Sequence, residues 1–387
     1  MFNWEKIIID YLKKHWLLLL FLFVTIIALL VRYSMRDFES GDYLTFLHPW
    51  FEELKLNGGF KALSNYPGDY NSPYMTIMAI LTYLPINELY SLKIVSCIFD
   101  FLLAISVGLL VRYLVKNNKD VLSFIAYTLT LFMPSVLLNS GMWCQCDSIY
   151  ATFVVLAFLY LFKEKYVRSF IFLGIAFSFK LQFIFILPIY IVLYVCNEKF
   201  SIINFLIIPL MNFILSLPAI IAGKPIIDCL MVYFKQTNTY KTSLTLNFPN
   251  IYNLISGDVA IFYKVGEMIS ILICALMLGY ILYKKVKWNN ERIFTLTIWF
   301  MVILTFVLPG MHERYLFVGE VLTLTYYIIY QKNLPLLIFM NISVIITYSS
   351  FLGGLSFDYL PLMSIIYTII IVYFTKDTLK LLEEKDN

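Results

Sequence analysis

The chain has 387 residues, of which 61% are hydrophobic and only 14% are charged. A soluble globular domain is about 45–50% apolar and about 25% charged, so this composition excludes a soluble globule, a disordered chain and a small disulfide-rich secreted module. The net charge of +4 offers no polybasic surface, and nucleic acid is therefore not an expected partner. We expect a lipid bilayer to surround most of the chain.

Apolar runs recur along the whole chain. A membrane-spanning helix needs about 20 residues, and the runs predict about twelve spans, within a range of about 10–13. These spans lie near 13–32, 92–115, 121–138, 149–163, 167–180, 182–196, 201–222, 266–284, 292–309, 315–330, 334–351 and 358–375. The sequence thus predicts an all-α polytopic membrane protein that forms a single transmembrane domain over residues 1–387.

Basic residues predict the orientation of these spans. Most of the 29 Lys and Arg residues fall in short segments on one side, which the positive-inside rule makes cytoplasmic, together with both termini. The other side has two long loops, at about 33–91 and 223–265, and long loops usually carry function. Within the first, residues 50–56 favour a helix on the membrane surface, and 74–84 an interfacial or re-entrant helix.

Three carboxylates directly follow the first predicted span. Asp37, Glu39 and Asp42 lie within six residues of one another, and the aromatic Trp50 follows. A carboxylate at the membrane boundary can be partly desolvated and can act as a general base. The alternative is an acidic loop that is simply solvated.

Other predicted outer segments also contain polar side chains. Gln145 precedes a span together with Asp147 and Ser148, either of which could instead cap the next helix. Lys180, near Gln182, either snorkels to the membrane surface or holds an anionic headgroup.

Two further outer segments are rich in polar residues. His312, Glu313 and Arg314 lie between two spans, where such side chains are costly unless they are paired or used. Asn250 lies in a polar, aromatic and kinked stretch that suits contact with carbohydrate.

Two acids are predicted to lie inside the membrane, near its outer surface. Asp100 and Glu320 are functional candidates, with hydrogen bonding between helices as the alternative. Lys93 and Lys180 are candidate partners of Asp100. His312 and Glu320 would share a helix face if the helix after 315 began early enough.

The candidate residues converge on one side of the topology. The candidate polar residues described above all lie on the outer side of a topology that is predicted from hydropathy and charge alone. A carboxylate base could deprotonate an acceptor hydroxyl, while cations neutralise a departing phosphate. We expect Lys180, His312 and Arg314 to hold a donor phosphate, and the following residues to contact substrate: Trp50, Gln145, Asp147, Gln182, Asn250 and Glu313.

Several short motifs resemble those of the integral-membrane GT-C glycosyltransferases. Gly41-Asp42-Tyr43 followed by Trp50 resembles the first-loop catalytic motif of the dolichyl-phosphate-glucose-dependent glucosyltransferases. The segments 178–180 and 312–314 are similar to later motifs of that superfamily. The segment 145–150 is similar to a stretch of the GPI mannosyltransferases and their bacterial relatives.

This resemblance implies an inverting transferase with Asp42 as its catalytic base. Asp37 and Glu39 form a DxD-like alternative, which some members link to metal or donor binding, so a divalent metal stays open as a cofactor. The donor would be a hexose of mannose, glucose or galactose type on polyprenyl phosphate. The acceptor would be a cell-envelope glycan or glycolipid on the extracytoplasmic face of a bacterial plasma membrane.

Two other classes remain open from the sequence. A flippase or other transporter of lipid-linked sugars should place polar groups near the bilayer midplane, often in repeated halves. The intramembrane acids here lie in the predicted outer half, and no repeat is visible. The other alternative is a non-catalytic membrane subunit that binds a glycolipid.

Overall fold

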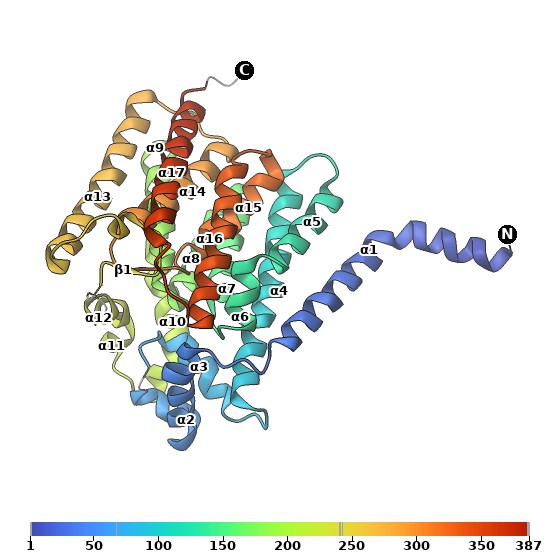
Figure 1. Cartoon of the computed structure of the whole chain (residues 1–387), viewed down its shortest axis with the longest axis horizontal. Helices are drawn as coiled ribbons and strands as arrows, with labels where there is room; N and C mark the ends of the chain where they lie inside the picture. The colour runs from blue at the N-terminus through green and yellow to red at the C-terminus, as the bar shows by residue number, and fades with distance from the viewer. Residues whose placement is uncertain (1, 67, 240, 242, 385–387) are drawn as a thin grey trace.

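The computed structural model describes residues 2–66, 68–239, 241 and 243–384. Tyr240 and Thr242 of the second predicted outer loop lie outside the described residues, as do Met1, Pro67 and the C-terminal 385–387, which include one basic residue of the predicted cytoplasmic side. The described chain is almost entirely helical (Figure 1). This agrees with the predicted all-α polytopic class.

Seven helices among the described residues are long and apolar enough to cross a membrane. They are α1 (Asn3–Ser34), α4 (Glu88–Leu114), η4 (Ile202–Leu206) with α10 (Ile207–Ile221), α13 (Val259–Lys284), α14 (Asn290–Val307), α16 (Leu334–Gly353) and α17 (Leu360–Glu383). The pair α5 (Lys119–Leu131) and α6 (Pro134–Gly141) would be an eighth span, bent by 47°. Pro134 explains the break, because proline is accepted in the first turn of a helix but not in its interior.

The remaining predicted spans are helical but short. They correspond to α7 (Asp147–Phe162), α8 (Tyr166–Phe179), η3 (Leu181–Ile186) with α9 (Leu187–Asn197), and α15 (Phe317–Tyr330). Each has fewer than 18 residues. Helix length alone therefore supports seven or eight spans in the described chain.

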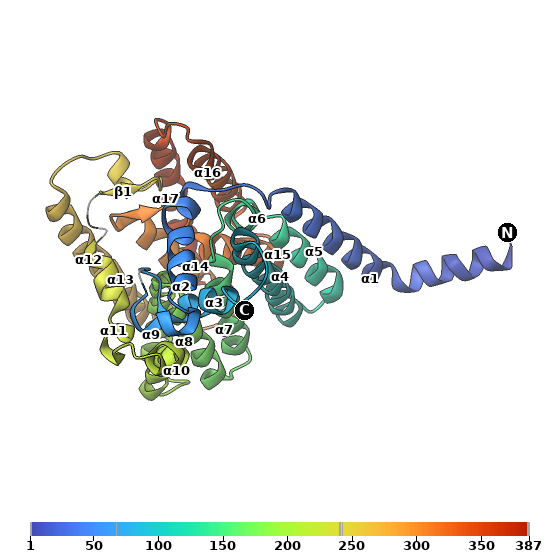
Figure 2. The same ribbon diagram turned by 90° about the horizontal axis from the view of Figure 1, so that it is seen from below.

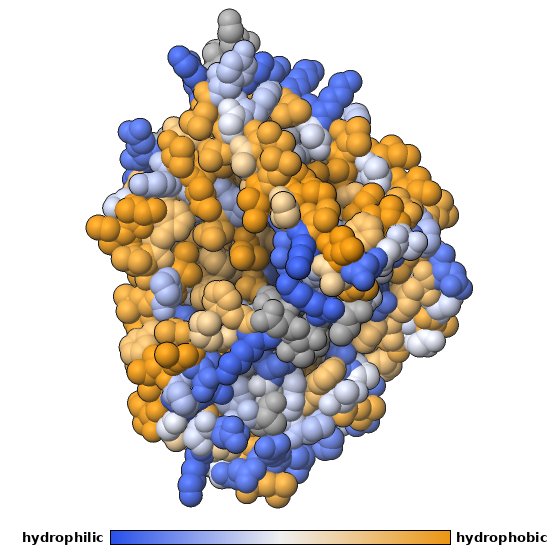
Figure 3. Space-filling view, turned by 90° about the vertical axis from the view of Figure 1, so that its left-hand side faces the viewer, coloured by the Kyte–Doolittle hydropathy of each residue, from blue (hydrophilic) through white to orange (hydrophobic). Residues whose placement is uncertain are grey.

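The helices differ sharply in how much of their surface they bury. In α14 every residue from Arg292 to Phe306 is buried, so this helix lies within the bundle. In α1 only Ala28 and Arg32 are buried, and its N-terminal part extends away from the other helices (Figures 1 and 2). Hydrophobic side chains also cover much of the face in Figure 3, as expected for a surface in contact with lipid.

Short elements gather at one end of the bundle, which we call the α2–α3 end. They are η1 (Tyr43–Leu47), α2 (His48–Leu56), η2 (Gly59–Asn65) and α3 (Ser72–Leu81) (Figure 1). Most of α3 is buried, so it packs beneath its neighbours and does not lie on the surface. In Figure 3, hydrophilic side chains lie at this lower end and also at the opposite, upper end.

A two-stranded parallel sheet joins distant parts of the chain. β1 (Thr245–Leu246) pairs with β2 (Met311–His312), with Leu246 opposite His312. β1 follows α11 (Ile226–Leu230) and α12 (Val232–Thr239), and η5 (Ile251–Asn253) comes after it. The sequence did not predict this pairing, which places the second long loop beside the segment that contains Arg314.

Candidate functional site

Asp42 lies in the first turn of the helical segment that leads into η1. The Ser40 hydroxyl accepts a hydrogen bond from the Tyr43 backbone N–H at 3.1 Å and donates one to the Trp143 carbonyl at 2.7 Å. Ser40 thus caps the start of this segment and ties it to the loop before α7. The backbone becomes π-helical at Tyr43, a geometry frequent at functional sites.

Three donors converge on one oxygen of Asp42. Its Oδ2 accepts hydrogen bonds from Trp143 Nε1 at 2.9 Å, Gln145 Nε2 at 2.8 Å and Arg314 Nη1 at 2.8 Å. Its Oδ1 accepts none within the described chain. Burial alone would raise the pKa of Asp42, but the charge of Arg314 and the hydrogen bonds from Arg314 and Trp143 hold it below its ordinary value of 3.8. The carboxylate is therefore ionised at neutral pH, with one oxygen free to accept a proton.

Asp147 forms a second, deeper ion pair. Its Oδ1 accepts a hydrogen bond from Lys180 Nζ at 2.6 Å, and its Oδ2 accepts one from Asn139 Nδ2 at 2.7 Å. Asp147 begins α7 but does not cap it, because the N-cap position is Cys146 and has no side-chain cap. The capping alternative is therefore wrong for Asp147, and the buried Lys180 does not snorkel.

Tyr70 links the two ion pairs. Its hydroxyl donates to Gln145 Oε1 at 2.8 Å, and Lys180 Nζ lies 5.7 Å from the centre of its ring. Trp50 packs edge-on against Tyr70 at 5.4 Å, so Trp50 reaches the site through this ring.

The segment 312–314 has donors without partners. Arg314 Nε and His312 Nδ1 are buried and form no hydrogen bond within the described chain. The carboxylate of Glu313 is also buried without a hydrogen bond, and one of its oxygens lies 3.5 Å from His312 Nδ1. The Arg314 guanidinium lies over Trp143 at 5.2 Å. A buried N–H group such as Arg314 Nε normally binds a partner, and an anion would satisfy it.

Asp100 has a different partner from those expected. Arg32 Nε donates to Asp100 Oδ2 at 2.8 Å, and the Ser148 hydroxyl donates to Oδ1 at 2.5 Å. Lys93 instead donates to the Met35 and Phe38 carbonyls, and Lys180 binds Asp147. The expectation that Lys93 or Lys180 pairs with Asp100 is therefore wrong. Asp100, on α4, thereby joins Arg32 near the end of α1 to Ser148 at the start of α7. Arg32 lies ten residues before Asp42 in the sequence.

The other two acids of the cluster at 37–42 lie apart from the donors around Asp42. Asp37 is exposed, forms an ion pair with Arg36 at 3.1 Å and accepts a hydrogen bond from Tyr90 at 2.5 Å. Glu39 is exposed and lines a separate pocket.

Three further candidates also lie outside these ion pairs. Asn250 uses its amide locally, accepting from the Tyr252 N–H at 3.1 Å in the turn of η5. Gln182 is half-buried in η3, directly after the segment that ends with Lys180. Glu320 is buried in α15, which begins at Phe317, so His312 does not share a helix face with it.

Two asparagines have structural roles in the site that the sequence did not predict. Asn139 lies at the buried end of α6, within a predicted span, and nothing in its local pattern distinguishes it. Asn71 donates to the Ser178 carbonyl at 3.0 Å and to Asn212 Oδ1 at 2.9 Å. It thereby joins the first loop to the segment before Lys180.

Within the described residues, no group of three or more His, Cys, Asp and Glu side chains is arranged to hold a metal ion.

Comparisons with known proteins give no family assignment. No protein-family model matches the sequence. No curated protein matches it either.

Proposed function

We propose that this protein is an inverting glycosyltransferase that moves a hexose from a polyprenyl-phosphate sugar to a cell-envelope glycan or glycolipid. The observation that carries the proposal is the ion pair between Asp42 and Arg314, with Asp42 Oδ1 and Arg314 Nε both lacking hydrogen-bond partners in the described chain. Asp42 can take a proton, and Arg314 beside it can bind a phosphate oxygen.

The chemistry balances with these groups. The acceptor hydroxyl gives its proton to Asp42 and forms a bond to the anomeric carbon of the sugar. The bond from that carbon to the phosphate oxygen breaks, and polyprenyl phosphate leaves. Arg314, with Lys180 and His312 nearby, stabilises the charge that grows on the phosphate. Attack opposite the leaving group inverts the anomeric centre.

The same proposal includes the finer topology. The four short helical segments would cross the membrane with the longer ones to give twelve spans in a GT-C arrangement. The α2–α3 end, with the active site, would face the extracytoplasmic side of a bacterial plasma membrane, and both termini would be cytoplasmic.

The test is transfer by purified protein in nanodiscs. Synthetic polyprenyl-phosphate hexoses are supplied with and without a panel of glycolipid acceptors, and released polyprenyl phosphate is measured. We expect acceptor-dependent release that falls by at least about 100-fold in Asp42→Asn. The matched control is Asp37→Asn, an exposed acid five residues away.

The two rival classes predict different results. Donor binding without release would indicate a non-catalytic glycolipid-binding subunit, and movement of the intact donor across the membrane would indicate a flippase. Loss of release in Asp37→Asn with full activity in Asp42→Asn would transfer the role of base to Asp37.

A further inference from the structure

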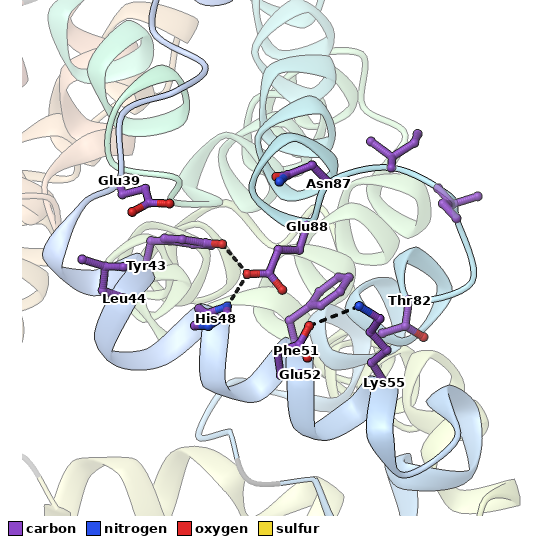
Figure 4. A pocket seen from close by; sticks show the side chains of 12 residues that line it. Glu39, Tyr43, Leu44, His48, Phe51, Glu52, Lys55, Thr82, Asn87 and Glu88 are labelled. Carbon is purple, nitrogen blue, oxygen red and sulfur yellow. Dashed lines mark hydrogen bonds and ion pairs between the residues drawn. The ribbon is translucent and has the colours of Figure 1, made fainter.

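A pocket of about 550 Å³ opens beside Tyr43, between α2 and the start of α4 (Figure 4). Its volume lies within the range of about 300–1,000 Å³ that is typical of small-ligand sites. Leu44, Leu84 and Ile86 line it and are 52%, 43% and 46% exposed. Such exposed apolar side chains suit contact with the lipid part of a ligand.

Polar groups converge on Glu88 inside this pocket. The Tyr43 hydroxyl and His48 Nδ1 both contact Glu88 Oε1, and Figure 4 shows these side chains, from η1, α2 and α4, pointing toward one another. Burial and the adjacent Glu88 raise the pKa of Tyr43 well above its usual range, so Tyr43 stays a donor. These two contacts hold the Glu88 side chain in a fixed position.

The pocket has more carboxylates than cations. Glu39, Glu52 and Glu88 all line it. Lys55 supplies the one Lys or Arg side chain of the lining and pairs with Glu52 at 3.3 Å. Two carboxylates close together repel each other unless a hydrogen-bond donor or a cation lies between them. The field of this pocket opposes a phosphate and favours a positively charged group.

The neighbouring residues Asp42 and Tyr43 belong to two different sites. Asp42 binds Arg314, whereas Tyr43 lines the acidic pocket. An anionic donor and a cationic acceptor would therefore bind next to the same short stretch of backbone, each beside groups of opposite charge.

We propose that this pocket binds the acceptor, and that the acceptor is a glycolipid with an amine-bearing saccharide headgroup. The assignment rests on the proposed transferase function. The amine would lie among Glu39, Glu52 and Glu88, and the lipid chain would leave past Leu44 and Ile86.

The test is binding of small alkyl glycosides without donor. Decyl glucosaminide, its N-acetylated form and its 6-phosphorylated form are titrated by calorimetry into the full-length protein in nanodiscs, below their micellar concentrations. We expect the free amine to bind about tenfold more tightly than the acetylated form, as for a charge-assisted hydrogen bond, and the phosphorylated form to bind weakest.

Four variants locate the binding. Glu88→Gln should lose most of the preference for the amine, and Glu39→Gln, on an exposed side chain that tolerates replacement, should lose part of it. Leu44→Trp should block all three ligands. Glu53→Gln is the matched control, because Glu53 is exposed on α2 and does not line the pocket.

Three results would overturn the inference: equal binding of the free and acetylated amines, tightest binding of the phosphorylated form, or an equal loss in Glu53→Gln. The binding titration contains no donor, so its result does not depend on the result of the transfer assay. Transfer without amine preference would reject the pocket assignment alone. Amine preference without transfer from any donor would reject the transferase and the acceptor role, leaving an amine-binding pocket.

Discussion

Arg314 lies 272 residues from Asp42 along the chain, yet its Nη1 donates to Asp42 Oδ2 at 2.8 Å. Both side chains are largely buried, being 12% and 18% exposed. A pair in this position is held by contacts on either side, Ser40 for Asp42 and the β1–β2 pairing for the segment before Arg314. It therefore depends on the folded structure of both loops at once.

The first prediction concerns the geometry of Arg314. Arg314→Lys keeps the charge but removes Nε and the planar fork, which suit bidentate binding of phosphate. We expect the KM for the donor to rise about tenfold or more, as for one lost charge-assisted hydrogen bond. Steady-state transfer with varied donor measures it. The control, Arg36→Lys, changes an exposed arginine and should leave the KM unaltered.

The second prediction concerns the buried ion pair between Lys180 and Asp147. Lys180→Met would leave an uncompensated buried carboxylate and should lower the free energy of unfolding by about 3–5 kcal/mol. Adding Asp147→Asn should restore much of that stability, because the unpaired charge is gone. Chemical unfolding in mixed micelles, followed by tryptophan fluorescence, gives both values. A double variant no more stable than Lys180→Met would contradict this account.

The third prediction concerns pH. Since the pKa of Asp42 is lowered, its ionised form contributes stability that is present above pH 3.8 and is lost as the pH falls through the lower folded value. Protonation of Asp42 should therefore not slow transfer between about pH 7 and pH 5. Rates at saturating donor test this. In Arg314→Met, which removes the lowering charge, the acid limb should move to higher pH.

The fourth prediction concerns Tyr70. Tyr70→Phe removes the hydrogen bond to Gln145 but keeps the ring that packs against Trp50. We expect a loss of about 1 kcal/mol in the free energy of unfolding, together with a lower transfer rate, because Gln145 is then less firmly oriented toward Asp42. Unfolding and transfer are measured on the same preparation. Tyr11→Phe, on the exposed face of α1, serves as the control.

Hydropathy predicted the helical segments well, including those near 149–163 and 167–180 that became α7 and α8. A long apolar run in lipid must satisfy its backbone hydrogen bonds internally, so its conformation follows from local composition. The number of spans was harder to predict, because short helices such as α15 do not reveal by length whether they cross. The short β1–β2 pairing left no recognisable pattern in two residues per strand.

The candidate site was predicted in part. Asp42, Gln145 and Arg314 were all singled out from their segments, and Gln145 and Arg314 both donate hydrogen bonds to Asp42. Asn139 was missed, and the partner of Asp100 was assigned to lysines. The contact of Asn139 and the pairing of Asp100 both depend on how a helix is rotated about its axis. The composition of a single span does not encode this rotation when most faces of the helix are apolar.

The sequence by itself determined that lipid is the solvent, where the helices lie, and which polar segments stand out between them. These properties follow from local hydrophobicity and charge. Only the tertiary structure decided that Arg32 pairs with Asp100, that Lys180 pairs with Asp147, and that Asp42 and Tyr43 serve separate sites. Such pairings depend on the distance between side chains far apart in the chain, and that distance is set by the packing of the whole bundle.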